Sequence, residues 1–478
     1  MHIGIACFIV FLIMAALMYS RRISALLALP VMAVAIAVVG GIPAERILKD
    51  VISAGAVKLH NAYTTTIFGA ILAELINKLG IAKALVRWVA EFAGDNPYLL
   101  ACVLTLVTAL LFSSMGGLGA VIMIGTVVLP VMLSLGISAI TAGGLYLFGI
   151  SLGGMFNLSN WQLYIEVLKI DLPQITAYVV PFAGIIALII LVFLFMELRS
   201  LRNLKYLAAG AMILVLGFFG LNLVVKPSDG SADGSVPLLP PSASMEANPL
   251  SIQAAGVVLI ILALYALSRH WRKEKSLPGA SFVAPCLPLL LVLLFHWEII
   301  PAFVAGIVYA TAITWHKDSV SLLTRSIIEG TAIVSPAVVL MLGIGMLLNA
   351  VMDPAIAKAI APLLSAIVPT HALPYILAFT ALAPLALYRG PLSLWGMGSG
   401  IVALIQKSTA LGSVAVMSML MSVGQLQGIC DPTNTHNVWI ATYLSTDTQA
   451  LLKRTIPYAW AAVFAGLSLA VLLHYVSW

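Results

Sequence analysis

The chain of 478 residues is 62% hydrophobic and 9% charged, and its mean hydropathy is +1.10. An ordinary soluble domain carries about 25% charged residues, so this composition excludes a soluble enzyme and predicts one polytopic protein embedded in a lipid bilayer. The formal net charge of +6 is explained by membrane topology rather than by a nucleic-acid partner.

The apolar segments predict an all-α polytopic membrane protein with about 12 transmembrane helices and two re-entrant hairpins. Residues 81–92 predict an interfacial helix, because three charged side chains recur at i, i+4 and i+8 on one face. Glu74, in the third crossing, is expected to snorkel or to pair with Lys78 four residues later. In the first half of the chain, crossings are expected at residues 1–20, 23–41, 62–79, 137–169 and 175–196, with an amphipathic approach at 47–59.

Polar or flexible residues interrupt a predicted hairpin at residues 97–134 and the crossing at 137–169. Small, flexible residues in the hairpin are typical of a tight tip where backbone approaches a ligand. The amide and hydroxyl side chains in the crossing can bind an anion or a small cation. The candidate substrate-binding residues are Ser113, Ser114, Gly116 and Gly117 at the tip, and Asn157, Ser159 and Asn160 at the break.

The middle of the chain contains a linker-like segment, residues 227–249, which is rich in Pro, Ser and Gly and has no basic residue. We expect it to be mobile and exposed between crossings at 206–225 and 252–267. Basic clusters at 199–205 and 269–275 flank these two helices and are expected on the inner face by the positive-inside rule. The N-terminus is then expected outside, in the cell (inner, cytoplasmic) membrane.

A longer polar stretch, residues 428–437, interrupts an apolar run in the second half. Asp431, Pro432 and the Thr/Asn run after them all disfavour the interior of a helix. Hydrocarbon tolerates non-helical backbone only around a protected cavity, so we interpret the stretch as a break in a membrane helix over residues 412–445. A surface loop between two helices is the alternative interpretation.

The second half of the chain repeats the first at an offset of 275 residues. At this offset Ile81-Ala82-Lys83-Ala84 pairs with Ile356-Ala357-Lys358-Ala359, and Gly55 pairs with Gly330. Two five-crossing repeats separated by an even number of crossings must be inserted in opposite directions, which is an architecture of secondary transporters. We predict a first repeat at 1–200 (hairpin 97–134, broken helix 137–169), two linker helices at 201–275 with the exposed loop 227–249, and a second repeat at 276–478 (hairpin 373–410, broken helix 412–445).

Arg389 lies at the tip of the second predicted hairpin. An Arg in apolar surroundings costs about 2.5–3.5 kcal/mol on insertion scales, so it needs a compensating partner. Its planar fork suits a carboxylate or phosphate, which makes it a candidate anchor for an anion. The alternatives are an ion pair with Asp431 and snorkelling to the interface. Gly390 and Ser393 are the other candidate substrate-binding residues at this tip.

The second break offers groups for a coupling cation as well as for an anion. Asp431 could bind Na⁺, carry a proton, or pair with Arg389. His436 is a candidate for proton transfer, although a lone His among Asn and Thr more often belongs to a hydrogen-bond network. The coupling-ion candidates are Asp431, Thr435 and His436, the substrate-binding candidates are Thr433, Asn434 and Asn437, and a Na⁺ site is expected near Asn157 and Asp431.

Further local motifs are spread over nearly the whole chain. They are Ser20-Arg21-Arg22-Ile23-Ser24-Ala25-Leu26, Gly94-Asp95-Asn96-Pro97, Gly154-Met155-Phe156-Asn157, Gly390-Pro391, Gly424-Gln425, and Thr442-Tyr443-Leu444 ahead of Lys453-Arg454. In these motifs and in its layout the chain resembles the ion transporter superfamily of secondary carriers, and within it the citrate–metal–proton symporter family. The resemblance implies a homodimer that carries small organic anions, coupled to H⁺ or Na⁺, by an elevator-like movement of the hairpin domain.

The first tip departs from the citrate family, whose tip is acidic and rich in threonine. The departure favours a different anion or coupling ion, and gluconate and C4-dicarboxylate carriers are neighbouring families. The resulting hypothesis is ion-coupled symport of a small organic anion, such as citrate, a C4-dicarboxylate or a sugar acid. The alternative is a Na⁺/H⁺ antiporter on the same scaffold, which the lone Asp431 permits and Arg389 argues against. Neither an enzyme nor a cofactor is expected, because the sequence has no nucleotide-binding loop and no Cys/His cluster.

Overall fold

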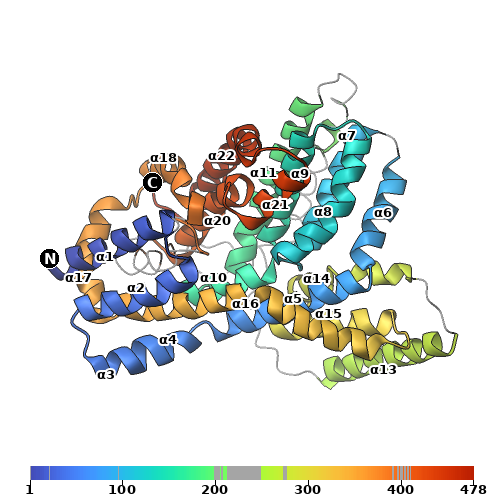
Figure 1. Cartoon of the computed structure of the whole chain (residues 1–478), viewed down its shortest axis with the longest axis horizontal. Coiled ribbons are helices and arrows are strands. Elements are labelled where there is room, and N and C mark those ends of the chain that lie inside the picture. The colour runs from blue at the N-terminus through green and yellow to red at the C-terminus, as the bar shows by residue number, and fades with distance from the viewer. Residues whose placement is uncertain are drawn as a thin grey trace. The chain divides into compact units, whose positions relative to one another are not determined.

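The computed structural model describes the chain apart from residues 1, 21, 95, 199–204, 206–207, 211, 213–248, 273–276, 390–391, 396–397, 399–401, 403–404, 406–408 and 410. The described residues form helices and their connections, and none of them lies in a β-strand (Figure 1). The predicted all-α polytopic fold is therefore confirmed. The crossing expected at 206–225 and the loop expected at 227–249 fall almost entirely outside the described residues.

The helices of the first half begin and end close to the predicted positions, and local capping explains several starts. Asn96 accepts hydrogen bonds from the amides of Tyr98 and Leu99, and Pro97 occupies the first position of α7. The bounds are α1 His2–Tyr19, α2 Ala25–Val39, α5 His60–Lys78, α6 Ile81–Ala93, α7 Pro97–Phe112, α8 Gly117–Ser134, α9 Ala139–Met155, α10 Leu158–Leu168 and α11 Leu172–Glu197. The amphipathic approach before α5 comprises α3 Ala44–Arg46, the π-helical segment η1 Ile47–Ser53 and α4 Ala54–Val57.

The second half contains a similar succession of helices. Asp353 and Asp447 cap α17 and α22 by accepting hydrogen bonds from the amides of Ala355 and Gln449. The bounds are α13 Pro249–Arg272, the 3₁₀ segment η3 Gly279–Val283, α14 Leu287–Phe295, α15 Ile299–Ile313, α16 Ser319–Val351, α17 Pro354–Ile367, α18 Ala372–Leu382, the 3₁₀ segment η4 Ala383–Arg389, α20 Ser413–Cys430, α21 Thr435–Tyr443 and α22 Thr448–Leu472.

Five helical segments of the described chain are long and apolar enough to cross a membrane, judged by length and composition. Three further pairs pass the same test together but bend by more than 40° at a short break, which gives up to eight spans. One of these pairs is Ala139–Met155 with Leu158–Leu168, so the first predicted break is confirmed. The five segments are Gly117–Ser134, Leu172–Glu197, Ser319–Val351, Ser413–Tyr443 and Thr448–Leu472, and Ser413–Tyr443 contains the break between α20 and α21.

The chain forms two compact units, each assembled from segments of both sequence halves. Unit 1 comprises Met1–Tyr63, Trp161–Leu238 and Ser335–Trp478. Unit 2 comprises Thr64–Asn160 and Leu239–Val334. The sequence predicts a different division, into two repeats and a linker. That division stays a prediction.

Unit 2 contains the first predicted hairpin, formed by α7 and α8, which packs against α6 and α9 (Figure 1). Glycines let α9 approach α7 closely, because a Cβ at Gly149 would lie 2.9 Å from the Thr105 carbonyl oxygen. The Tyr146 hydroxyl of α9 donates a 2.7 Å hydrogen bond to the Val121 carbonyl of α8. The hairpin is therefore held against α9, the helix that leads into the first break.

Unit 1 contains the second broken helix, α20 and α21, and packs α20 against α22, α11 and η4. The buried Tyr178 hydroxyl of α11 lies 2.7 Å from Ser422 Oγ of α20 and 3.1 Å from the Gly466 carbonyl of α22. The Tyr375 hydroxyl of α18 donates a 2.8 Å hydrogen bond to the Ala415 carbonyl of α20. These two hydroxyl groups fix the first half of the broken helix on two sides.

Two helix contacts support the sequence repeat. In unit 1, Gly345 of α16 packs directly on the Gly55 carbonyl of α4. In unit 2, Gly330 of α16 packs on α5, where an added Cβ would lie 2.8 Å from the Ala70 carbonyl oxygen. The offset of 275 converts Gly55 into Gly330 and Ala70 into Gly345, so each contact is the counterpart of the other. This reciprocity is what two copies of one repeat would produce.

Candidate functional site

The tip of the first hairpin and the first break meet in unit 2. Helix α7 ends at Phe112, α8 begins at Gly117, and Asn157 lies between α9 and α10. The Asn157 side-chain amide donates to the carbonyls of Phe112 and Met115, at 3.3 Å each. Its oxygen accepts a 3.0 Å hydrogen bond from the Ser159 amide. One side chain thus binds both ends of the tip and also caps the helix that follows the break.

The two serines of the tip are buried, and their hydroxyl groups bond to the protein itself. Ser113 Oγ donates a 2.7 Å hydrogen bond to the Leu110 carbonyl, and Ser114 Oγ donates to the Pro285 carbonyl. Gly116 and Gly117 are exposed, and Gly117 has a φ of +81°, in the left-handed region that favours glycine. The open group at the tip is therefore the backbone at the N-terminus of α8, where Gly116 gives no side-chain cap.

The first break is narrower than the sequence predicts. Ser159 and Asn160 lie in the first turn of α10, because Asn157 supplies the cap that allows the helix to restart at Leu158. Asn160 donates a 2.8 Å hydrogen bond back to the Gly154 carbonyl at the end of α9. Ser159 faces α5, since a Cβ at Gly69 would lie 3.4 Å from Ser159 Oγ. The predicted residues of this break are brought together with the tip and with α5.

The second break lies inside unit 1 and is buried, which contradicts the alternative of a surface loop. Asp431 is 1% exposed, and its Oδ1 accepts hydrogen bonds from the Thr433 amide at 2.9 Å and the Thr433 hydroxyl at 2.6 Å. Asn437, 4% exposed, donates a 3.0 Å hydrogen bond to the Ile429 carbonyl. Its Oδ1 is buried and has no hydrogen-bond partner among the described residues. A buried amide oxygen of this kind can accept a ligand hydrogen bond or bind a cation.

His436 belongs to a local hydrogen-bond network at the same break. Its Nε2 lies 3.0 Å from the Asn434 side-chain nitrogen and 3.1 Å from the Gly428 carbonyl oxygen. The network connects the end of α20 with the start of α21. Thr435 is exposed at the first position of α21.

The second tip is described only in part. Segment η4 ends at Arg389 and packs against α20. The side chain of Arg389 and all of Gly390 lie outside the described residues, so pairing of Arg389 with an anion or with Asp431 stays a prediction. Ser393 is 1% exposed, and in the part of unit 1 that the structure describes its hydroxyl has no hydrogen-bond partner.

The structure adds two carboxylates, Glu166 and Glu74, to the candidate residues predicted from the sequence. Glu166 of α10 is 7% exposed, and its Oε1 accepts a 3.0 Å hydrogen bond from the Asn61 amide at the start of α5. Its other oxygen is buried without a partner in the described chain. Glu74 of α5 lies next to the first tip. The sequence predicts the pairing of Glu74 with Lys78, but it does not show which face of α5 adjoins the first tip.

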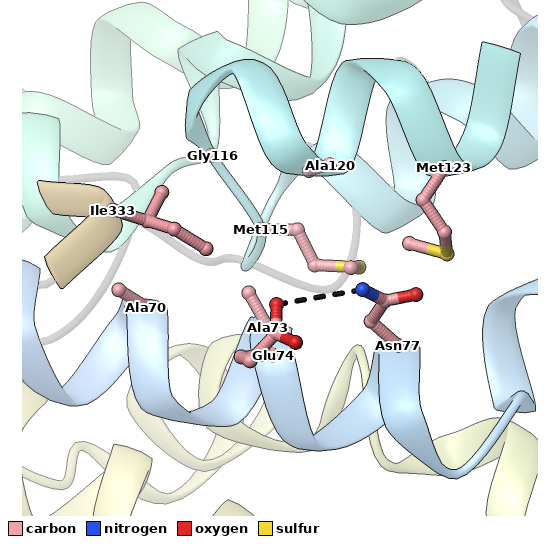
Figure 2. Close-up of a pocket in the computed structure, with 9 residues that line it drawn as sticks. All are labelled: Ala70, Ala73, Glu74, Asn77, Met115, Gly116, Ala120, Met123 and Ile333. Atoms are coloured by element: carbon pink, nitrogen blue, oxygen red, sulfur yellow. Dashed lines mark hydrogen bonds between the residues drawn. The ribbon is translucent and has the colours of Figure 1, made fainter. Parts of the chain in front are cut away.

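A small cleft in unit 2 places Glu74 beside the first tip. The cleft is narrow and partly open to the outside. Figure 2 shows Glu74 and Asn77 projecting from α5 below Met115, with α8 on the opposite side. The lining residues are Ala70, Ala73, Glu74, Asn77, Met115, Gly116, Ala120, Met123 and Ile333.

Among the described residues, no group of three or more His, Cys, Asp or Glu side chains is arranged to hold a metal ion. A Na⁺ site near Asn157 or Asp431 would therefore need backbone, amide or hydroxyl oxygens as ligands, together with the Asp431 carboxylate at the second break. That site stays a prediction.

No protein-family model and no curated protein sequence matches the chain. Among solved structures, the chain is similar to the YdaH transporter of Alcanivorax borkumensis, with a TM-score of 0.53 and 16% identity over 90% of this chain and 89% of that one. It is also similar to MtrF of Neisseria gonorrhoeae, described in a class of antimetabolite efflux pumps, with a TM-score of 0.40 and 16% identity over 89% and 82% of the two chains. The first likeness shows that this membrane protein shares the fold of the YdaH transporter over most of its length.

Proposed function

We propose that the protein is a secondary active transporter that carries a small organic anion by symport with a cation. The observation that supports this most strongly is the contact of Asn157 with both ends of the first hairpin tip. A helix broken inside an apolar protein exposes polar groups that only an enclosed ligand or neighbouring protein can satisfy. Broken helices of this kind form the solute sites of secondary transporters.

The groups at these breaks and tips favour an anion as the substrate. The first amides of α8 follow the exposed Gly116 and have no side-chain cap, so they can bind a carboxylate at the positive end of the helix. In unit 1, the Ser393 hydroxyl lacks a partner in the described part of the tip. Arg389, four residues earlier, would supply the charge that fixes a carboxylate.

The proposal keeps the substrate class implied by the sequence resemblance and leaves the family open. Assignment to the citrate–metal–proton symporter family finds no support in the comparisons. Citrate, a C4-dicarboxylate and a sugar acid all belong to the proposed class. An elevator-type movement, a homodimer and an inner-membrane location with the N-terminus outside are further parts of the proposal.

The test begins with thermal unfolding of the purified protein in the presence of citrate, C4-dicarboxylates and gluconate, with and without Na⁺ and at two pH values. A ligand that binds only the folded protein raises its unfolding temperature with concentration. Counterflow of the stabilising anion in proteoliposomes then tests transport. Arg389→Ala is expected to abolish counterflow while the protein remains folded, and alanine at the exposed Arg325 is expected to leave counterflow intact.

Normal counterflow by the Arg389→Ala variant would remove the anchor role of Arg389. If no carboxylate shifts the unfolding temperature and none is exchanged, the anion class is wrong. Na⁺-driven proton movement in the same vesicles without any organic anion would instead identify a Na⁺/H⁺ antiporter.

A further inference from the structure

We infer that Glu74, in the cleft beside the first hairpin tip, carries the proton that is coupled to transport. The inference rests on the proposed function and specifies both the coupling cation and the group that binds it. Glu74 is the carboxylate of the cleft, and its side chain is 11% exposed. It extends from α5 towards Met115, which lies in the turn that Asn157 binds (Figure 2).

The contacts of Glu74 with neighbouring side chains are long. Its Oε1 lies 3.6 Å from Lys78 Nζ, and its Oε2 accepts a 3.4 Å hydrogen bond from the Asn77 side chain. Lys78 makes its short contact, 2.6 Å, with Glu329 Oε2. Two carboxylates therefore share one ammonium group, and the closer one is Glu329. Among the described residues, Lys78 is the cation within ion-pair distance of these two carboxylates, so the group carries one excess negative charge, and Glu74, the more buried carboxylate, has the longer contact.

The repeat relation shows what Glu74 lacks. The residue equivalent to Glu74 in the second repeat is Asn349, and the residue equivalent to Ile333 is Lys58. In unit 1, Lys58 Nζ lies 2.6 Å from Asn349 Oδ1, and the Asn349 amide donates a 2.7 Å hydrogen bond to the Asp50 carbonyl. In unit 2, a carboxylate replaces the amide, and Ile333 replaces the lysine. The position that holds a cation beside Asn349 therefore holds a hydrocarbon side chain beside Glu74.

The chemistry of the cleft favours a proton over Na⁺. A hard metal cation takes about six oxygen ligands, as Ca²⁺ and Mg²⁺ do. The side chains that line the cleft offer oxygen atoms only at Glu74 and Asn77, and the others are Ala, Met and Ile or lack a side chain. A proton needs one carboxylate oxygen and removes the uncompensated charge completely. Protonation of Glu74 would also change the electrostatic attraction between α5 and the positive end of α8, whose first residues lie at the cleft.

The test uses the full-length protein in proteoliposomes and the anion identified by thermal unfolding. Glu74→Gln keeps the size of the side chain and mimics the protonated carboxyl. This variant is expected to lose accumulation driven by a pH gradient at least tenfold while it retains anion counterflow, which needs no net proton transfer. Glu91→Gln is the matched control, because it neutralises an exposed carboxylate of unit 2 that does not line the cleft, and it is expected to retain pH-driven accumulation.

A second variant tests the repeat argument. Ile333→Lys would place beside Glu74 the cation that Lys58 provides to Asn349, and it is expected to hold the carboxylate ionised and to abolish pH-driven accumulation. Loss of coupling in both Glu74→Gln and Ile333→Lys, with counterflow preserved in the former, supports the inference. If Glu74→Gln does not fold, the pH profile of counterflow is measured in the Glu74→Asp protein. A profile shifted from that of the natural protein supports the inference, and an unshifted profile overturns it.

Other outcomes separate this inference from the proposed function. If the natural protein shows no counterflow of any carboxylate, the proposed function fails together with this inference. If the natural protein accumulates the anion and Glu74→Gln does so equally, only the role of Glu74 is refuted. Loss of counterflow in a folded Glu74→Gln protein would place Glu74 in anion binding rather than in coupling, and accumulation driven by a Na⁺ gradient alone would refute the proton.

Discussion

Replacement of Asn157 by Asp tests the connection between the first break and the first hairpin tip. Aspartate has the same shape and still accepts the hydrogen bond from the Ser159 amide, but an ionised carboxylate cannot donate to the carbonyls of Phe112 and Met115. Two neutral hydrogen bonds, each worth about 1 kcal/mol, are lost. Release of the tip from the break is then easier by about 2 kcal/mol, which corresponds to about a 30-fold larger open population.

Hydrogen exchange measures this opening directly. The amides of Ser113 and Met115 bond to the carbonyls of Ala109 and Leu111, so they exchange when the turn opens. We expect these amides to exchange about 30-fold faster in the Asn157→Asp protein. At low pH the slow exchange is expected to return in part, because a protonated carboxyl can donate one hydrogen bond.

Asn160→Asp is the matched control for this experiment. It removes a 2.8 Å hydrogen bond to Gly154 at the same break and leaves the tip contacts intact. Its effect on exchange at residues 113–115 is expected to be small. Equal exchange at these amides in the natural and Asn157→Asp proteins, or equal acceleration in both variants, would refute the proposed connection.

Three further substitutions follow from unit 1. Ser393→Ala removes a buried hydroxyl that has no hydrogen-bond partner in the described chain. It is expected to leave the unfolding temperature unchanged or raised and to weaken anion binding in a titration. A clear loss of stability would contradict this. Tyr178→Phe removes the contacts of a fully buried hydroxyl with Ser422 and is expected to destabilise the protein by about 1–2 kcal/mol in thermal unfolding, whereas an unchanged midpoint would show that these contacts are not stabilising. Gly345→Ala forces a Cβ onto the Gly55 carbonyl and is expected to lower both expression and unfolding temperature, and normal behaviour would show that α4 and α16 are not packed this closely.

Helix positions and breaks were predictable because they depend on local chemistry. Asn96-Pro97 starts α7, and Asp431-Pro432 ends α20, since Pro lacks an amide proton and short polar side chains compete with helical hydrogen bonds. The exact width of a break depends on non-local partners. Asn157 folds back to cap α10, which is why Ser159 is helical although the sequence around it favours a loop.

Side-chain roles at the candidate site were less predictable, because tertiary contacts decide them. Ser114 is a ligand candidate by sequence, but its hydroxyl bonds to the Pro285 carbonyl, a residue far away in the chain. Glu74 was visible only as a helical partner of Lys78, since the sequence does not tell which face of α5 adjoins Met115. The offset of 275 pairs Gly55 with Gly330, but the equivalent glycine contacts of the two halves became visible only in the structure.

Hydrogen exchange with and without the transported anion tests the central claim most directly, because it reports binding and its location together. An anion that raises the unfolding temperature is expected to slow exchange at residues 116–119, where the amides of α8 are uncapped, and at the break beside Asn157. Protection confined to other segments, with unchanged exchange at the tip and at the break, would contradict the account.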